Sequence, residues 1–532
     1  MFKNYIGLLF LVFSLNTFGL NAMAAKTLIY CMEGSPASFN PQITTDSVSM
    51  NASSQTIFNR LVDFKKGSTE VEPSLALSWT VSKDRKSYTF KLRKDVAFQS
   101  NDIFTPTRTF NANDVVYTFK TQMDPKNPLA IPNGNYEYFK GMELDKIISD
   151  VKKVDDYTVV FELTKPEAPF LANLAMDFAS ILSEEYAQSL VKSGKGLKTL
   201  ETKPIGTGPF VFKSYQKDST VRYTAFDKYY KGKPKLDNLV FVVVTDSTVR
   251  LQKMKTGECH VMSEPQPQDI EQIQKLPGVK LVSTEGLNTG YVAFNTSKKP
   301  FDNVKVREAF TMALNKKSYI DAIYKGQGTI AKNPIPPTMW SYSKATKDDE
   351  YNTEKAKKLL TEAGFANGFD TELWTIPVSR PYMPNGKKMG ELMQADLAKI
   401  GIKVKLVTFD WPTYLEKTKQ GLHPVAQMGW TGDNGDPDNF LNVLLGCSAV
   451  EAGSNIARWC NKEFNEEVQK AKEEPTQAKR TKLYEQAQAV FKKEKPWVTI
   501  AHSRLNKVVS DKVTGYTINP FGHEQFESVD IK

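Results

Sequence analysis

The sequence predicts an α/β protein with more than one domain, and three observations support this. Predicted strands and helices alternate through the second half of the chain, the order found in α/β domains. The chain has 532 residues, enough for more than one hydrophobic core. Hydrophobic residues make up 40% of it and charged residues 24%, the usual composition of a soluble globular protein.

In the first half, apolar runs and alternating residues mark strands, and capping residues mark helices. Residues 87–92 alternate as a half-buried strand should, and residues 239–244 form a continuous run typical of a buried strand. Asn111 is a candidate N-cap for a helix that starts in residues 110–117. The other predicted elements are helices in 48–60 and 248–257 and strands at 26–31, 157–163, 210–215 and 221–225.

The second half repeats the strand–helix order. A strand at 288–295 is predicted to start a new unit, and residues 301–316 after it carry apolar side chains at helical spacing. Gly364 ends a predicted helix, and Pro412 lies near the start of another, as these residue types often do. The remaining predicted elements are helices at 353–363, in 386–400 and at 411–420, and strands at 369–376 and 402–409.

Residues 1–25 have the features of a secretory signal peptide. Lys3 supplies the positive start, residues 6–15 are apolar, and small residues at 22–25 allow cleavage, expected after Ala25 with Ala24 as the alternative. The apolar run is too short to span a membrane. No Cys follows directly, which argues against a lipoprotein. We therefore expect an exported, soluble protein.

The four cysteines suggest two disulfides in an exported chain. Cys447 and Cys460 are close in sequence and are expected to pair, which leaves Cys31 with Cys259. A metal site is the alternative interpretation. Against it, the chain has no Cys-x-x-Cys pattern, and His260 is the only histidine adjacent to a cysteine.

The net charge of +10 arises from scattered Lys and Arg residues. A nucleic-acid-binding protein usually carries a basic patch together with a recognisable reader motif. The sequence contains neither a block of five or six like charges nor such a motif. No nucleic-acid partner is therefore predicted.

Residues 429–440 combine three glycines, three aspartates and two aromatic residues. This composition predicts a turn-rich loop, which by composition alone is more often a solvent loop than a functional one. Several carboxylates beside bare backbone and Trp430 could instead bind a cationic ligand. A calcium-binding loop is excluded, because the third and fifth positions from Asp433 are Gly435 and Pro437.

The common enzyme motifs are missing or out of context. Residues 326–331 fit a Gly-x-Gly-x-x-Ala pattern, but a predicted helix precedes them and prolines follow, where a dinucleotide site needs a strand and a helix. The chain has no Gly-x-Ser-x-Gly and only four histidines to act as a catalytic base. We therefore expect no enzyme, no cofactor and no metal site. An exported peptide hydrolase remains the alternative of a different class.

Several stretches together resemble the large periplasmic solute-binding proteins of peptide ABC importers, in particular the dipeptide-binding members. Each stretch alone is weak, but their order and spacing over nearly the whole mature chain make the match specific. The four cysteines also lie where the dipeptide-binding members have two disulfides, which supports the pairs given above. The matching stretches are residues 30–31, 33–36, 39–42, 59–62, 113–116, 206–210, 304–307 and 429–440.

The resemblance implies a two-lobed periplasmic-binding-protein fold of the cluster C type. Lobe one would comprise residues 26–286, with an extra subdomain near 57–207, and residues 504–532 would return to it. Lobe two would comprise residues 287–503. Two crossovers would form a hinge, and the lobes would close on ligand.

The resemblance also implies ligand-binding residues. An extended dipeptide would lie between the lobes, hydrogen-bonded through its backbone like an added strand. Asp433 matches the aspartate that receives the α-ammonium, and Arg380 matches the arginine that takes the α-carboxylate, since each buried charge needs an opposite partner. The distance between them would set the peptide length, and side-chain selectivity should be broad. The other expected wall residues are Tyr382, Gly429, Trp430, Thr431, Thr44 and Thr45.

Relatives of this type that bind glutathione or haem can share the Asp433 loop, so these ligands remain alternatives to dipeptides. Arg380 with Pro381 and Tyr382, and the Cys447 and Cys460 pair, favour dipeptides. The expected partner is the permease of an ABC importer in the inner membrane. The resemblance further implies a periplasmic monomer.

Overall fold

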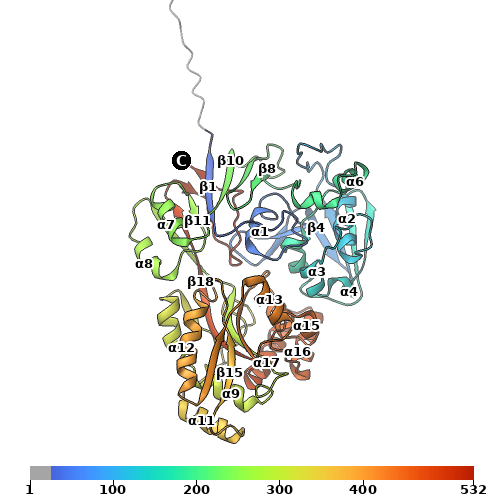
Figure 1. Ribbon diagram of the computed structural model, residues 1–532. Coiled ribbons are helices and arrows are strands. Elements are labelled where there is room, and N and C mark those ends of the chain that lie inside the picture. The colour runs from blue at the N-terminus through green and yellow to red at the C-terminus, as the bar shows by residue number, and fades with distance from the viewer. Residues whose placement is uncertain (1–24) are drawn as a thin grey trace, which may run out of the picture.

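The computed structural model describes residues 25–532, so the predicted signal peptide lies outside these residues except for Ala25. Figure 1 shows two bodies of strands and helices, one above the other, with β18 (Trp497–Ser510) running from one into the other. The fold is thus α/β with two lobes, as predicted. None of the helices among these residues is long and apolar enough to cross a membrane.

The largest sheet has twelve strands and passes through both lobes. On one side of the crossing it contains β1 (Thr27–Met32), β8 (Phe210–Gln216), β9 (Thr220–Ala225), β10 (Asn238–Val243), β11 (Val261–Met262) and β12 (Val279–Glu285). On the other side it contains β13 (Asn288–Phe294), β14 (Gly328–Ile330), β15 (Phe369–Trp374), β16 (Ile402–Val407) and β17 (Val425–Thr431). The strand order is β16-β15-β17-β13-β18-β11-β1-β10-β9-β8, with β12 and β14 also paired to β18.

β18 changes partners where the lobes meet. As far as Ser503 it pairs with β13 and β14, and from Arg504 onward it pairs with β12 and β11. Only Gly286 and Leu287 separate β12 from β13, so the two connections between the lobes lie next to each other in the sheet. The exact lobe boundaries given above remain predictions.

A second, antiparallel sheet forms the side of the upper body in Figure 1. Its order is β4-β5-β7-β6, with β4 at Ala76–Val81, β5 at Ser87–Leu92, β6 at Ile148–Asp155 and β7 at Thr158–Leu163. Helix α2 (Ala112–Met123) packs on it, with Phe119 edge-on to Phe161 at 4.9 Å between ring centres. The predicted cap is confirmed, because Asn111 and Asp114 form a capping box at the start of α2.

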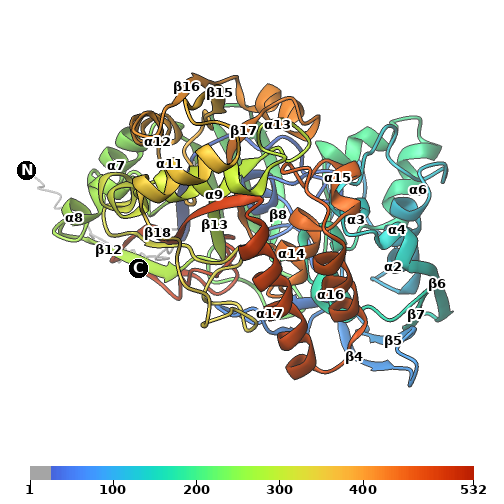
Figure 2. The same ribbon diagram turned by 90° about the horizontal axis from the view of Figure 1, so that it is seen from below.

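Helices cover the faces of both sheets. Seen from below, α14, α16 and α17 lie beside the body that carries the four-stranded sheet (Figure 2). The helices other than α2 are α1 (Ser47–Ala52), α3 (Glu137–Gly141), α4 (Leu144–Ile147), α5 (Phe170–Leu174), α6 (Glu184–Lys192), α7 (Ser247–Lys255), α8 (Ile270–Ile273), α9 (Val304–Ala313), α10 (Lys316–Tyr319), α11 (Thr353–Glu362), α12 (Gly386–Ala398), α13 (Trp411–Lys419), α14 (Asp438–Leu445), α15 (Ser448–Ala452), α16 (Lys462–Glu473) and α17 (Gln477–Glu494). Short helical turns are η1 (Asp177–Ala179), η2 (Leu197–Glu201), η3 (Pro267–Asp269) and η4 (Ile320–Tyr324), and two-stranded pairs join β2 (Val62–Phe64) to β3 (Val71–Pro73) and β19 (Val513–Thr514) to β20 (Asp530–Ile531).

The prediction of a helix in residues 48–60 is wrong beyond Ala52, where α1 ends. The hydroxyl of Ser53 donates to a carbonyl of the preceding turn, which competes with helix continuation. The carbonyl of Ile57 then accepts the amide of Gly208 at 2.8 Å. Glycine allows this approach, because a Cβ on Gly206 or Gly208 would lie 2.2 or 2.5 Å from backbone atoms of Ile57.

Both predicted disulfides are present. Cys31 is bonded to Cys259, with 5.8 Å between their Cα atoms, and Cys447 to Cys460, with 4.7 Å. The first joins β1 to the segment after α7, and the second closes a short loop. Because all four cysteines are used in this way, the alternative metal site is excluded.

Candidate functional site

A cavity of about 1160 Å³ lies between the lobes, next to the crossing strands. Segments from both bodies contribute side chains to its wall, including residues within 33–50, 135–142, 245–250, 264–267, 378–384, 411–419, 428–433, 443–456, 503–506 and 521–523. Of the eight predicted ligand-binding residues, seven line this cavity, and Thr44 does not. The structure therefore brings these residues together, while their contacts with a ligand remain predictions.

Asp433 lies just after β17 and is nine-tenths buried. Its carboxylate accepts hydrogen bonds from the Tyr138 hydroxyl at 2.8 Å and from the Asn439 amide at 3.4 Å. Burial raises the pKa of Asp433 to about 7, and these hydrogen bonds offset only part of the rise. A buried carboxylate that forms no ion pair with any described residue favours a cationic group beside it.

Residues 429–440 form less of a loop than predicted. The first three belong to β17 and the last three to α14, so the turn itself covers only residues 432–437. The interpretation as a solvent loop is wrong, because Asp433, Asn434, Asp436 and Asp438 are between 1% and 9% exposed. The turn is buried because it lies between the two lobes, an arrangement that composition cannot reveal.

A strong ion pair holds this turn in place. The Asp436 carboxylate accepts two hydrogen bonds from the guanidinium of Arg480, both at 2.7 Å. The pair is buried, and such bidentate geometry fixes orientation as well as distance. The backbone amide of Asp433 donates to Asn439 at 3.0 Å. Together these contacts fix the direction of the Asp433 side chain.

Arg380 lies half-buried in the segment after β15. Its guanidinium is stacked over Trp411, 5.3 Å from the ring centre. Its backbone forms a two-way bridge with Met383, which fixes the turn between them. Among the described residues Arg380 has no carboxylate partner, and a guanidinium so placed can bind a carboxylate through two parallel hydrogen bonds.

Tyr382 packs against a pair of glycines in neighbouring strands. Gly290 of β13 is paired with Gly429 of β17. A Cβ on Gly429 would lie 2.1 Å from the Tyr382 ring, and one on Gly290 would lie 2.2 Å from the Tyr382 carbonyl oxygen. That carbonyl accepts a hydrogen bond from Tyr324 at 2.7 Å. Gly429 is therefore needed as space for Tyr382.

The other predicted wall residues differ in how they are placed. The indole of Trp430 donates to the same side-chain oxygen that holds the Asp433 amide, at 3.0 Å. Thr431 ends β17 and lines the cavity. Thr45 is exposed, and its carbonyl accepts from the Tyr138 hydroxyl at 3.4 Å. Thr44 is buried away from the cavity.

Tyr138 is a site residue that the sequence analysis missed. It lies on α3, lines the cavity, and donates to Asp433 across the lobes. The same helix is tied to α13 by the ion pair between Glu137 and Lys419, at 2.6 Å. In the sequence Tyr138 follows only a common polar turn, so no pattern distinguishes it.

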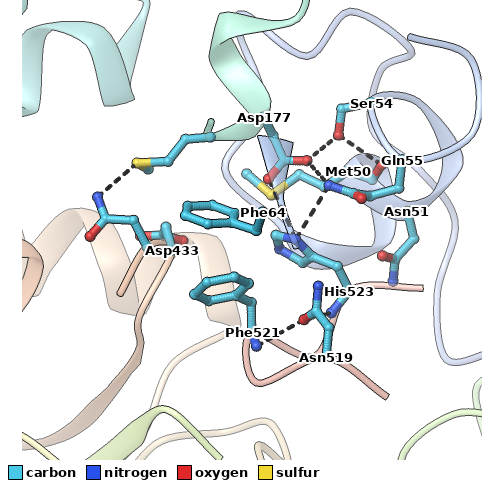
Figure 3. A network of polar contacts seen from close by, with 12 residues as sticks. Met50, Asn51, Ser54, Gln55, Phe64, Asp177, Asp433, Asn519, Phe521 and His523 are labelled. Carbon is cyan, nitrogen blue, oxygen red and sulfur yellow. Dashed lines mark hydrogen bonds and ion pairs between the residues drawn. The ribbon is translucent and has the colours of Figure 1, made fainter. Parts of the chain in front are cut away.

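A second polar network lies behind the cavity wall near the C-terminal residues, and of its polar members His523 lines the cavity (Figure 3). The carboxylate of Asp177 lies 3.6 Å from Nδ1 of His523. Although burial opposes it, the charges of His523 and a neighbouring arginine hold the pKa of Asp177 below its ordinary value. Figure 3 shows the rings of Phe64 and Phe521 between this network and Asp433.

Known proteins resemble this chain along most of its length. Residues 70–452 match the model for bacterial extracellular solute-binding proteins, family 5. The chain is 51% identical over 512 residues to the dipeptide-binding protein of Escherichia coli K12, with 96% of each protein covered. It is 47% identical to heme-binding protein A of Haemophilus influenzae, with 95% of this chain and 92% of that protein covered.

A solved structure agrees with these matches. The dipeptide-binding protein of Pseudoalteromonas sp. SM9913, determined in complex with Met-Leu, superposes with a TM-score of 0.89 at 38% identity, covering 95% of this chain and all of that one. The predicted resemblance and the two-lobed fold are thereby confirmed. The chain belongs to family 5 of the bacterial extracellular solute-binding proteins.

Proposed function

We propose that this protein captures dipeptides between its lobes and delivers them to a peptide ABC importer. The observation that carries the proposal is the Asp433 carboxylate, which lines the cavity between the lobes and has no cationic partner among the described residues. Support also comes from the relatives, since one at 51% identity is a dipeptide-binding protein and a similar structure holds Met-Leu.

Each end of a dipeptide has a matching group in the cavity. The α-ammonium would pair with Asp433, and the α-carboxylate would receive hydrogen bonds from the Arg380 guanidinium. The peptide backbone would extend along the end of β17, where Gly429 and Thr431 line the wall. In this role the protein would be a periplasmic carrier that binds and releases its ligand unchanged, and would not act as an enzyme.

Blocked peptides test the two charged contacts. We expect Ala-Ala to bind the mature protein in titration calorimetry, and both N-acetyl-Ala-Ala and Ala-Ala-amide to bind far more weakly. Removing one partner of a buried pair costs about 3–5 kcal/mol, which is more than 100-fold in affinity. Tight binding of the acetylated peptide would contradict the role of Asp433.

A substitution tests the same contact from the protein side. Asp433→Ala should weaken Ala-Ala binding by about two orders of magnitude or more. Asp302→Ala is the matched control, because Asp302 is exposed and lies outside the cavity wall. Its affinity should equal that of the unchanged protein. Free amino acids appearing during the titration would favour the hydrolase alternative instead.

Haem remains the main alternative ligand, because a relative at 47% identity is a heme-binding protein. Mass spectrometry of the ligand that copurifies with the protein distinguishes the two. Dipeptides in the bound fraction support the proposal. A porphyrin that Ala-Ala does not displace would favour the alternative.

A further inference from the structure

One end of the cavity wall is apolar. Side chains from α13, α14, β17 and the loop after α15 form most of it, and one methionine directly after α3 adds to it from the other lobe. All of these side chains belong to one hydrophobic cluster or pack against it. The residues of this apolar wall are Met142, Leu415, Met428, Val443, Leu444 and Ile456.

The polar side chains at this end of the cavity are already hydrogen-bonded within the protein. The hydroxyl of Ser454 donates to the Val443 carbonyl at 2.7 Å, and that of Thr418 donates to a carbonyl of its own helix at 2.9 Å. Lys419 forms the ion pair with Glu137 across the lobes. These groups therefore leave mainly hydrocarbon surface for a ligand.

The back of the apolar wall is a loop closed by a disulfide. The bond between Cys447 and Cys460 joins the two ends of the loop, with 4.7 Å between their Cα atoms. Residues between them line the cavity, among them Ala452 and Ile456. The side-chain amide of Asn455 donates to two carbonyls at the base of the loop, at 3.2 and 2.8 Å. The disulfide thus limits how far this part of the wall can move.

The apolar wall begins beside the predicted ammonium site. One side-chain oxygen of Asn439 accepts from both the Asp433 amide and the Trp430 indole, each at 3.0 Å. Val443 lies four residues further along α14, so it shares a face of the helix with Asn439. Successive side chains of an extended ligand point to opposite sides, so only one side chain of a dipeptide can face this wall. Its place next to Asp433 assigns it to the first residue.

We propose that the loop between Cys447 and Cys460 is the selectivity element of the cavity, and that with α13 and α14 it forms an apolar subsite for the side chain of the first residue of a dipeptide. The subsite favours Leu over Ala, and over Asn, a polar side chain of similar shape. Loss of the disulfide weakens this preference, because the loop then holds the wall less firmly. The inference narrows the broad selectivity that the resemblance implies. It rests on the proposed function, because it takes Asp433 as the group that binds the ammonium.

Peptides that differ in one side chain test the inference on the mature protein. In titration calorimetry, Leu-Ala should bind about tenfold more tightly than Ala-Ala, because its larger apolar side chain leaves water. Asn-Ala should bind no more tightly than Ala-Ala. Ala-Leu is the control for position and should gain much less over Ala-Ala than Leu-Ala does.

Removing the disulfide tests the loop. In Cys447→Ala/Cys460→Ala, the ratio of Ala-Ala to Leu-Ala dissociation constants should fall from about ten to about three or less. Cys31→Ala/Cys259→Ala is the matched control, because it removes the other disulfide, whose cysteines lie outside the cavity wall. Its ratio should stay near that of the unchanged protein. A ratio measured on one protein sample is insensitive to a general loss of folded protein.

The variant Ala452→Phe tests the same loop without touching the disulfide, and serves if the cysteine variant does not fold. Ala452 is exposed and lines the cavity, so a larger side chain there can fill the subsite without disturbing the core. Leu-Ala should then bind no more tightly than Ala-Ala, while Ala-Ala still binds.

The outcomes separate this inference from the proposed function. A ratio near one in the unchanged protein, or equal gains for Leu-Ala and Ala-Leu, would overturn the subsite while dipeptide binding stands. An unchanged ratio in folded Cys447→Ala/Cys460→Ala would overturn the role of the disulfide, and an unchanged ratio in Ala452→Phe would overturn that of the loop. If Ala-Ala and the whole panel fail to bind, the proposed function falls and the subsite falls with it.

Discussion

Ligand binding and protein stability favour opposite ionisation states of the Asp433 carboxyl group. Binding an ammonium requires the ionised carboxylate, but burial favours the neutral form and raises the pKa of Asp433 to about 7, against an ordinary value of 3.8. A carboxyl group with a raised pKa in the folded state contributes fully to stability below its unfolded pKa. This contribution is lost as the pH rises through 7. Above neutral pH, the ionised carboxylate of Asp433 should therefore lower the free energy of unfolding of the ligand-free protein.

The variant Asp433→Asn measures this effect, because Asn keeps an acceptor for Tyr138 and removes the charge. Without ligand, we expect its melting temperature to exceed that of the unchanged protein at pH 8 and to match it more closely at pH 5. Asp302→Asn, at an exposed position, should show no such pH dependence. If Asp433→Asn were equally destabilised at both pH values, the ionised carboxylate would be satisfied without ligand.

At the level of the secondary-structure elements, Tyr382 packs directly on the paired strands β13 and β17. Gly429→Ala would place a Cβ 2.1 Å from the Tyr382 ring, so the segment that carries Arg380 must move. We expect a lower melting temperature, since overpacking typically costs about 1–3 kcal/mol of stability, and weaker Ala-Ala binding, because Arg380 moves with this segment. Gly34→Ala is the control, because its Cβ would meet only Val48, at an ordinary 3.8 Å. Unchanged binding in Gly429→Ala would show that Tyr382 does not position Arg380.

The same elements show which features a sequence can predict. The start of α2 could be predicted because the capping box is local, with Asn111 and Asp114 three residues apart. The course of the chain after α1 could not, because the carbonyl of Ile57 accepts a hydrogen bond from Gly208, far away in the chain. Tyr138 was missed for the same reason, since its contact with Asp433 spans 295 positions. Local signals predicted elements, whereas contacts between distant segments determined where they end and what they touch.

For the whole molecule, the two disulfides close loops of very different length. The bond between Cys31 and Cys259 spans 228 positions, and that between Cys447 and Cys460 spans 13. Loop-closure entropy predicts that removing the first lowers the free energy of unfolding by about 5 kcal/mol and removing the second by about 3 kcal/mol. Urea unfolding of Cys31→Ala/Cys259→Ala and of Cys447→Ala/Cys460→Ala measures both. A larger loss in the second variant would mean that local packing, and not chain entropy, sets the contribution.

The body with the four-stranded sheet meets α14–α17 through a buried charged contact. Lys472 of α16 lies 3.5 Å from Glu167, and the side chains are 1% and 0% exposed. The amide of Ala168 also donates to the Lys472 carbonyl at 2.6 Å. Burial raises the pKa of Glu167 to about 8 and that of Asp438 to about 6, while Lys472 opposes both shifts. Because Asp438 begins α14 directly after the Asp433 turn, this contact links the binding residue to the other lobe.

Lys472→Met would leave Glu167 and Asp438 buried without their ammonium. The free energy of unfolding should then fall by about 3–5 kcal/mol at pH 8, and by less at pH 5. The sign follows from the raised pKa values, because both carboxyl groups lose their stabilising contribution as the pH rises through 6 and 8. The double variant Glu167→Gln/Lys472→Met should recover most of this loss in free energy of unfolding, since it removes one uncompensated charge. Urea unfolding at pH 5 and pH 8 measures the unchanged protein and both variants. If the loss in free energy of unfolding were independent of pH and not recovered in the double variant, Lys472 would stabilise the contact by packing. Its charge would then play no part in holding the Asp433 turn against the other lobe.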